Sequence, residues 1–205
     1  VALQYPLIRR RAFTLNANLG FDHKRLRDDI ETADSHIPRR DNLWNIGLSG
    51  SFDDHWGGGG SNAFSLIYSR GNIGFDDAAA AAYDEVTART AGGFGKLLFT
   101  YGRQQVLREN LQLLLNFAGQ LADKNLDTAE KFYLGGPGGV RAYPQGEATG
   151  DQGYRLSGEL RLLVPGLSSA KSSFFVNGFF DCGAVRLNKN PWVGSGDANY
   201  RSLSG

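Results

Sequence analysis

The chain has 205 residues, of which 41% are hydrophobic and 21% charged, with a formal net charge of +1. This composition excludes a disordered tail, and the near-neutral charge gives no indication of a nucleic-acid partner. No apolar run approaches the ~20 residues of a membrane-spanning helix, whereas a transmembrane β-strand needs only ~9–11 residues with apolar side chains at alternate positions. The 28 glycines and 12% aromatic residues favour β structure with tight turns.

Alternation of apolar and polar residues predicts strands along the chain. In residues 12–22, Phe13 and Leu15 alternate with Thr14 and Asn16, as in a strand with one apolar and one polar face. The same alternation, or an equivalent apolar run, recurs in residues 1–8, 44–52, 64–69, 96–102, 111–121, 154–162 and 173–185. We therefore predict an all-β fold with about eight antiparallel strands.

The connections between these segments alternate between short and long. The short connections are residues 9–11, 55–60, 105–109 and 166–171, and the long ones are residues 29–40, 73–92, 122–152 and 187–201. Short periplasmic turns and long extracellular loops are typical of an up-and-down transmembrane barrel. A soluble Greek-key sandwich has no reason to show this rhythm, although its strands also alternate. The pattern thus predicts an antiparallel transmembrane β-barrel.

Charged side chains lie on the polar face of one predicted strand. Arg155, Glu159 and Arg161 share this face in residues 154–162. Their burial in a dry core would be costly, so we predict that they line a water-filled lumen.

A carboxylate lies at a similar place in the strand at residues 173–185. Asp181 has the opposite parity to Val176 and Phe180, so an apolar face toward lipid would direct Asp181 into the lumen. A solvated charge on the barrel wall is the simpler interpretation of such a residue. Pairing with an arginine is the more specific one, and it would be charge-assisted.

The sequence contains no recognisable catalytic or metal-binding pattern. His23, His36 and His55 are scattered, and Cys182 is the single cysteine, which excludes an internal disulfide. Nucleotide-binding and serine-nucleophile motifs are missing. We therefore expect no metal, no cofactor and no enzymatic activity.

One long connection has an unusual composition. Residues 131–151 read KFYLGGPGGVRAYPQGEATGD, and the stretch Val140-Arg141-Ala142-Tyr143 within it is not typical of a turn. A later strand contains Phe179-Phe180-Asp181-Cys182-Gly183.

This pair of motifs resembles the two-partner secretion transporters (TpsB), the hemolysin-activator and filamentous-haemagglutinin exporter family of the outer-membrane assembly-factor superfamily. In that superfamily a Val-Arg-Gly-Tyr or Val-Arg-Gly-Phe tetrad lies on a loop that folds back into the lumen. Its arginine pairs with the aspartate of a Phe-x-Asp-x-Gly strand. The resemblance implies that Arg141 pairs with Asp181, which anchors the loop. Val140, Ala142 and Tyr143 would complete the tetrad.

The sequence departs from the family pattern at one position and adds a flexible segment nearby. Ala142 occupies the place of the usual glycine, which makes a positive φ there less favourable but should not prevent the pairing. Gly135, Gly136 and Pro137 are expected to form the hinge of the loop.

The resemblance implies an outer-membrane pore of a Gram-negative bacterium that translocates and activates an unfolded partner exoprotein, such as a hemolysin or adhesin. Residues 1–205 would be a fragment of the C-terminal transmembrane barrel domain, a barrel of about 16 strands that is monomeric in the lipid membrane. The N-terminal POTRA domains, the first strands and the last strands would be absent. Two alternatives are an assembly factor that inserts outer-membrane proteins, and a soluble β-sandwich binding module.

Overall fold

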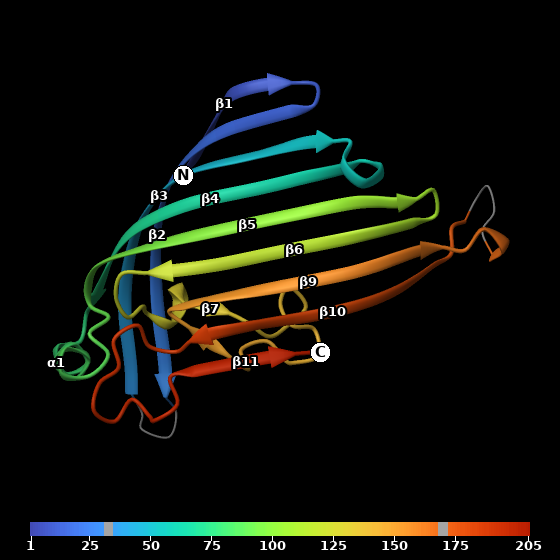
Figure 1. Ribbon diagram of the computed structural model, residues 1–205. Coiled ribbons are helices and arrows are strands. Elements are labelled where there is room, and N and C mark those ends of the chain that lie inside the picture. The colour runs from blue at the N-terminus through green and yellow to red at the C-terminus, as the bar shows by residue number, and fades with distance from the viewer. Residues whose placement is uncertain (31–34, 168–171) are drawn as a thin grey trace.

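The computed structural model describes residues 1–30, 35–167 and 172–205. Most of them belong to one antiparallel sheet of nine strands in the order β1-β2-β3-β4-β5-β6-β9-β10-β11 (Figure 1). The strands are β1 (Ala2–Arg10), β2 (Phe13–Ile30), β3 (Ser35–Asp54), β4 (Gly60–Phe75), β5 (Gly92–Arg108), β6 (Leu111–Ala122), β9 (Gln152–Leu163), β10 (Phe175–Arg186) and β11 (Tyr200–Ser204). Every strand of the sheet pairs with its neighbours in sequence around the loop between β6 and β9, as in an up-and-down barrel.

The prediction of an antiparallel all-β fold is confirmed, and each predicted segment coincides with a strand. The expected long connection at residues 29–40 is wrong in its extent. The ladder between β2 and β3 continues to the pair Ile30 and Ser35, and residues 31–34 lie outside the described residues. The outer face carries Arg25, Arg27 and Arg40, and on the inner face Leu26 and Ile37 are interspersed with charged residues, so no regular hydrophobic period marks the extension although its ladder continues.

Two further differences concern the C-terminal part of the sheet. A ninth strand, β11, occupies residues for which no strand was predicted, and it pairs with β10 between Cys182 and Arg186. The connection expected at residues 166–171 is longer than predicted, because β9 ends at Leu163 and β10 begins at Phe175. It includes the short 3-10 helix η4 (Pro165–Leu167), and residues 168–171 lie outside the described part.

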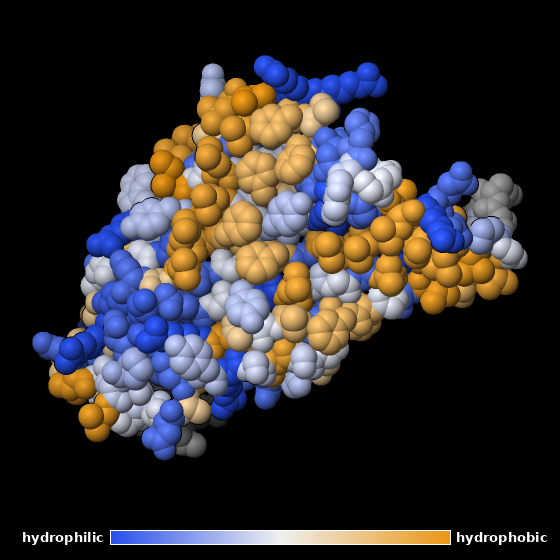
Figure 2. All heavy atoms as spheres, viewed as in Figure 1, coloured by the Kyte–Doolittle hydropathy of each residue, from blue (hydrophilic) through white to orange (hydrophobic). Residues whose placement is uncertain are grey.

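The two faces of the sheet differ in polarity. On the outer face, one row of residues in register across five strands is apolar or aromatic and consists of Leu19, Ile46, Tyr68, Leu97 and Leu121. On the inner face, a row in register across seven strands is small or polar and consists of Thr14, Ser51, Ala63, Gly102, Asn116, Ser157 and Asp181. Figure 2 shows hydrophobic spheres in a band across the strands, with hydrophilic spheres gathered near α1. This distribution suits lipid outside and water inside.

The two ends of the sheet carry different connections. At one end lie short turns, including the 3-10 helix η2 (Trp56–Gly58). At the other end lies the helix α1 (Ala78–Val86), where Asp77 accepts hydrogen bonds from the amides of Ala79 and Ala80 as an N-cap. None of the helices in the described ranges has the length and hydrophobicity to cross a bilayer.

Candidate functional site: a loop on the inner face

The connection between β6 and β9 folds back along the inner face of the sheet. It contains the 3-10 helix η3 (Thr128–Glu130) and two short strands, β7 (Phe132–Tyr133) and β8 (Thr149–Gly150), that pair antiparallel. Residues 134–148 form a compact turn region between these strands. A loop of this length with its own short sheet is thus held as a defined element.

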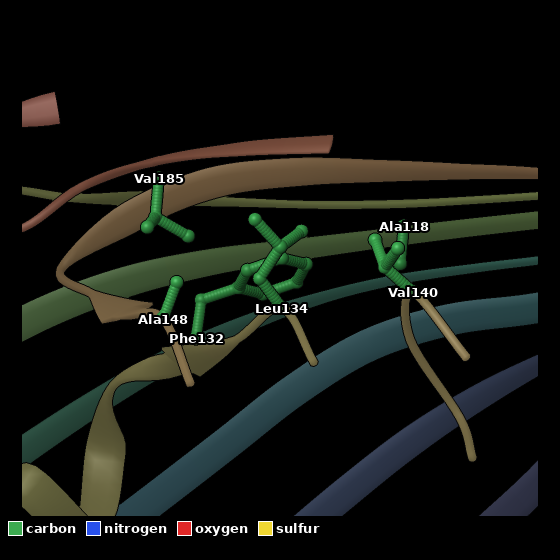
Figure 3. Close-up of a cluster of buried hydrophobic side chains, with 6 residues drawn as sticks. All are labelled: Ala118, Phe132, Leu134, Val140, Ala148 and Val185. Carbon is green, nitrogen blue, oxygen red and sulfur yellow. The ribbon is translucent and has the colours of Figure 1, made fainter. Parts of the chain in front are cut away.

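A hydrophobic cluster fastens the loop to the sheet. Figure 3 shows Phe132, Leu134 and Val140 of the loop beside Ala118 of β6 and Val185 of β10. Leu134 and Val140 are fully buried. Burial of a Val, Leu or Phe side chain contributes roughly 1.5–3 kcal/mol. Because these residues come from the loop and from two strands, they orient the loop before any charged contact is considered.

The turn region depends on two glycines. Gly136 has a φ of +106°, which residues with a side chain rarely adopt. A Cβ on Gly139 would lie 2.0 Å from the carbonyl oxygen of Leu134. This close approach permits the hydrogen bond from the Val140 amide to the Leu134 carbonyl, at 2.8 Å. Of the predicted hinge, Gly135 and Gly136 are thus buried in the turn, and Pro137 is exposed beside them.

The side chain of Arg141 reaches the inner face of β10. Its Nε donates to Asp181 Oδ2 at 2.7 Å, and its Nη2 donates to Oδ1 at 2.9 Å. The Arg141 amide donates to the same carboxylate at 3.1 Å. The guanidinium lies over the Phe179 ring, 3.7 Å from its centroid. This bidentate, stacked geometry is specific to arginine, and we call the Arg141–Asp181 contact the tip anchor.

The tip anchor also involves the neighbouring strand. Arg141 donates from Nη1 to Glu159 at 3.0 Å and from Nη2 to the Ser157 hydroxyl at 3.2 Å. The Asp181 carboxylate raises the pKa of Arg141 further above its ordinary value, against the effect of burial, and Glu159 adds to it. The guanidinium is therefore a permanent cation, held by two carboxylates on adjacent strands.

The other predicted lumenal charges lie near this anchor in two different arrangements. Arg161 donates to Glu159 at 3.2 Å, so these residues form a continuous charged network with Arg141. Arg155 does not join the network, and its guanidinium lies 5.7 Å from the centroid of the Phe132 ring. Glu159 and Arg155 therefore lie against loop residues, and Arg161 is connected to the loop through Glu159.

The two remaining tetrad residues differ in their surroundings. Ala142 is exposed, and Arg89 is the one non-glycine residue with positive φ among those described. Ala142 therefore adopts a backbone conformation that an alanine accepts without strain. Tyr143 is partly buried and packs against the hydrophobic cluster.

A second charged cluster, which the sequence analysis missed, holds the base of the loop. Glu130 is 2% exposed. Its carboxylate contacts Lys24 of β2 and lies 2.8 Å from the ammonium of Lys96 of β5. Gln120 donates to the Glu130 carbonyl at 3.1 Å. Burial alone would raise the pKa of Glu130, but Lys96 and Lys24 outweigh it and hold the pKa below its ordinary value. We call the contacts of Glu130 with Lys24 and Lys96 the base anchor.

A buried carboxylate next to the base anchor joins the loop to the connection between β10 and β11. Asp151 is fully buried and pairs with Lys131 at 2.8 Å. It accepts hydrogen bonds from the amide of Leu126 at 3.0 Å and from the amide of Lys189 at 2.7 Å. For the base anchor, the available signal was parity: Lys96 has inward parity in its predicted strand at residues 96–102, and Lys24 continues the inward parity just beyond the predicted strand at residues 12–22. Their partner could not be inferred, because Glu130 lies 106 residues from Lys24.

A cavity of about 600 Å³ lies between the tip of the loop and the inner face. Pro137, Gly138 and Arg141 line it from the loop, and Ser65 and Asn116 line it from the sheet. Its lining can accept hydrogen bonds and donate them. No group of three or more metal-ligating side chains occurs within the described ranges.

The fold defines a class of protein, the antiparallel transmembrane β-barrels. The chain supplies nine adjacent strands of such a barrel. The model of the family described as haemolysin secretion/activation protein ShlB/FhaC/HecB matches residues 1–196, and the chain belongs to this family. Its members are two-partner secretion transporters (TpsB).

Three known proteins are similar to this chain. The heme/hemopexin transporter proteins HuxB of Haemophilus influenzae strains Rd and 86-028NP are each 27% identical to it over 191 residues, which is 92% of this chain. The chain spans about a third of their length, 33%. CdiB from Escherichia coli has the same fold, with a TM-score of 0.77 and 17% identity over 99% of this chain and 36% of CdiB.

The family assignment decides between the alternatives raised by the sequence. TpsB transporters are secretion channels rather than enzymes. They are outer-membrane proteins of Gram-negative bacteria and work with secreted exoprotein partners. The interpretation as a soluble β-sandwich module is therefore excluded, and the secretion branch is favoured over assembly factors.

Proposed function

We propose that this chain forms part of the pore through which an outer-membrane transporter passes and activates a partner exoprotein, with the loop at residues 131–151 inside the lumen. The observation that supports this most directly is the tip anchor. A guanidinium on a connecting loop meets a buried carboxylate, Asp181, on the inner face of a strand at 2.7 Å. A surface loop would have no need of a partner 40 residues away inside the barrel.

The remainder of the protein is part of the same proposal. Because the chain spans 33% of the length of its curated relatives, we assign it to a C-terminal barrel domain of about 16 strands preceded by POTRA domains. The full barrel would be monomeric in the outer membrane. Its cargo would be an unfolded adhesin or hemolysin, and no cofactor or nucleic acid would take part.

Each inner-face residue has a distinct proposed role in this pore. Arg141 and Asp181 hold the tip of the loop, and Glu159 and Arg161 brace the guanidinium through the network at 3.0 and 3.2 Å. Arg155 lines the path of the cargo beside Phe132. The hinge of the loop is assigned to Gly135, Gly136 and Pro137, where the positive φ of Gly136 favours glycine.

A charge exchange in the full-length transporter tests the proposal. Asp181→Arg places two guanidinium groups face to face, so we expect export of the partner to fall to background and bilayer conductance to rise as the loop tip leaves the lumen. The double variant Arg141→Asp/Asp181→Arg recreates an ion pair and should recover part of both properties. Like charges at this distance repel, and opposite charges in a buried site restore the contact.

A matched control separates loss of the anchor from a general effect of charge. Asp197 is an exposed residue of the connection after β10, and Asp197→Arg introduces the same change of charge. Its export and conductance should equal those of the wild type. Normal export by the Asp181→Arg variant, with the barrel correctly inserted, would refute the proposed anchor.

A further inference from the structure

A row of arginines lies on the outer face, beyond the apolar band at the loop end of the sheet. Arg25 of β2 is directly opposite Arg40 of β3, and Arg40 is directly opposite Gly74 of β4. Two rows closer to the middle of the strands, Phe21 packs against Trp44 with ring centroids 4.7 Å apart. The outer face thus changes along β2 and β3 from aromatic side chains to guanidinium groups.

The arginines of this row are only partly neutralised by the protein. Two like charges directly opposite each other on neighbouring strands destabilise a sheet. Arg40 pairs with Asp76. In the part of the chain that the structure describes, the side chain of Arg25 makes no hydrogen bond and no ion pair, and the residue is exposed. The row therefore presents a positive potential that an external anion would lower.

A cavity at the surface surrounds these guanidinium groups. Its volume is about 490 Å³, and the charged residues that line it are Arg25, Arg27, Arg39, Arg40 and Asp76. Gly74, opposite Arg40, leaves open space beside it, because a Cβ there would meet no atom within 4 Å. Arg39 faces inward and is paired with Asp28 and Asp127. The outer-face guanidinium groups of Arg25 and Arg40 are therefore the ones that would meet an anionic ligand in this cavity.

The depth of the row in the membrane indicates which ligand would reach it. Arg25 lies four positions after Phe21 in β2. This is ~13 Å along the strand and roughly 10 Å along the membrane normal for a strand tilted by ~40°. Headgroups add roughly 5–8 Å beyond each side of the hydrocarbon core. Since aromatic side chains such as Trp44 prefer the core boundary and arginine side chains extend back toward it, Arg25 and Arg40 lie level with the headgroups.

We propose that Arg25 and Arg40 bind the phosphate groups of a phosphorylated glycolipid, of the lipid A type, in the outer leaflet. The proposal rests on the barrel lying in an outer membrane with its long connections outside. Guanidinium groups bind phosphate oxygens bidentately, and two of them can neutralise a doubly charged headgroup. The acyl chains would lie along the apolar band that includes Leu19 and Ile46, which are 45% and 61% exposed.

Binding of purified lipids to the full-length transporter in detergent tests this site. The probes are bisphosphorylated lipid A, the same lipid without phosphates, and phosphatidylglycerol, each measured by native mass spectrometry and by competition with a fluorescent lipid A. We expect lipid A to bind at least about tenfold more tightly than either of the other lipids. Equal binding of the dephosphorylated lipid would refute phosphate recognition, and equal binding of phosphatidylglycerol would refute a glycolipid as the occupant.

Variants then assign the binding to these side chains. Arg25→Gln/Arg40→Gln should lose the preference for phosphorylated lipid A. Arg10→Gln, which removes an exposed outer-face arginine at the opposite end of the barrel, should retain it. Asp76→Asn removes the carboxylate that competes for Arg40 and should tighten binding. An unchanged preference in the double variant, or an equal loss in Arg10→Gln, would overturn the proposal.

A conservative variant protects the test against misfolding. Arg25→Lys/Arg40→Lys keeps both charges but loses the bidentate geometry, so an intermediate affinity is expected. Export of the partner, measured in all variants, distinguishes this site from the pore, since neither arginine faces the lumen. Loss of lipid A preference with normal export supports the lipid site alone.

Discussion

The tip anchor and the base anchor both hold the same loop against the same face, but they use different chemistry. At the tip, a planar guanidinium meets Asp181 through two parallel hydrogen bonds and stacks on an aromatic ring. At the base, the carboxylate of Glu130 receives the ammonium groups of Lys24 and Lys96 from β2 and β5. The tip therefore has one cation and several acceptors. At the base, two cations meet the Glu130 carboxylate, and Lys24 also lies 3.7 Å from the buried carboxylate of Asp41.

This difference affects what each contact can do. Arginine geometry is directional, so the tip anchor fixes the orientation of the turn as well as its position. Ammonium groups are compact charges on flexible chains, and two of them from separate strands tolerate small shifts of the sheet. The base anchor is therefore suited to a permanent attachment. The tip anchor is suited to a contact that has one defined engaged geometry.

The largest effect should follow from removing the cation of the tip anchor. Arg141→Ala leaves Asp181, whose side chain is 1% exposed, as a buried carboxylate without a cation, which costs roughly 3–5 kcal/mol. Arg141→Lys keeps the charge and should cost about half as much. Urea unfolding of the full-length barrel in vesicles, followed by tryptophan fluorescence, measures both.

Arg161→Ala is the control, since Arg161 is 37% exposed, and should cost less than about 1 kcal/mol. Equal losses for Arg141→Ala and Arg161→Ala would contradict the special role of the tip.

A smaller, pH-dependent effect should follow from neutralising the base anchor. Because the pKa of Glu130 is lowered in the folded protein, its contribution is present above its ordinary pKa and is lost as the pH falls through the lowered value. Glu130→Gln should therefore cost about 1–3 kcal/mol at pH 7, and the difference from wild type should shrink as the pH falls below the ordinary pKa of glutamate and through the lowered pKa of Glu130. The same unfolding experiment at several pH values measures this convergence.

The control for the base anchor is Glu147→Gln, an exposed glutamate of the same loop. Its stability should follow that of the wild type at every pH. If the difference between Glu130→Gln and wild type did not change with pH, ion pairing at Glu130 would not be the cause of the stabilisation.

The smallest effect concerns the departure of the tetrad from its family pattern. Ala142 does not have a positive φ, so a glycine there gains no relief of strain and adds flexibility to the unfolded chain. Ala142→Gly should therefore destabilise the barrel by about 0.5–1 kcal/mol. Thermal unfolding of the full-length protein would detect it, and a stabilised variant would show that the tip anchor holds a strained backbone.

Much of the barrel was predictable because its information is local. The period-2 alternation sets which side chains of a strand share a face, so the inward direction of Asp181, Glu159 and Arg161 followed from parity alone. The partner of Asp181 came from the resemblance to a family motif rather than from parity. The structure brings the two side chains together, and their role in transport is still a proposal.

The parts that could not be predicted depend on pairing between distant segments. Beyond the apolar band, charged residues interrupt both faces of β2 and β3, so no regular alternation marks their ends at Ile30 and Ser35. The strand β11 is five residues long and is stabilised by its register with β10. In both places the backbone hydrogen bonds of a neighbouring strand, and not the local hydrophobic pattern, decide where the strand ends.

By itself, the sequence determined that this protein is an antiparallel barrel with apolar residues outside and charged residues inside, because side-chain direction in a strand depends only on parity. Only the tertiary structure decided that Glu130 meets Lys24 and Lys96, and that Arg25 lies beside Arg40. These contacts join residues far apart in the chain. Their formation depends on the register of each strand pair and on how the loop closes, and neither leaves a local pattern in the sequence.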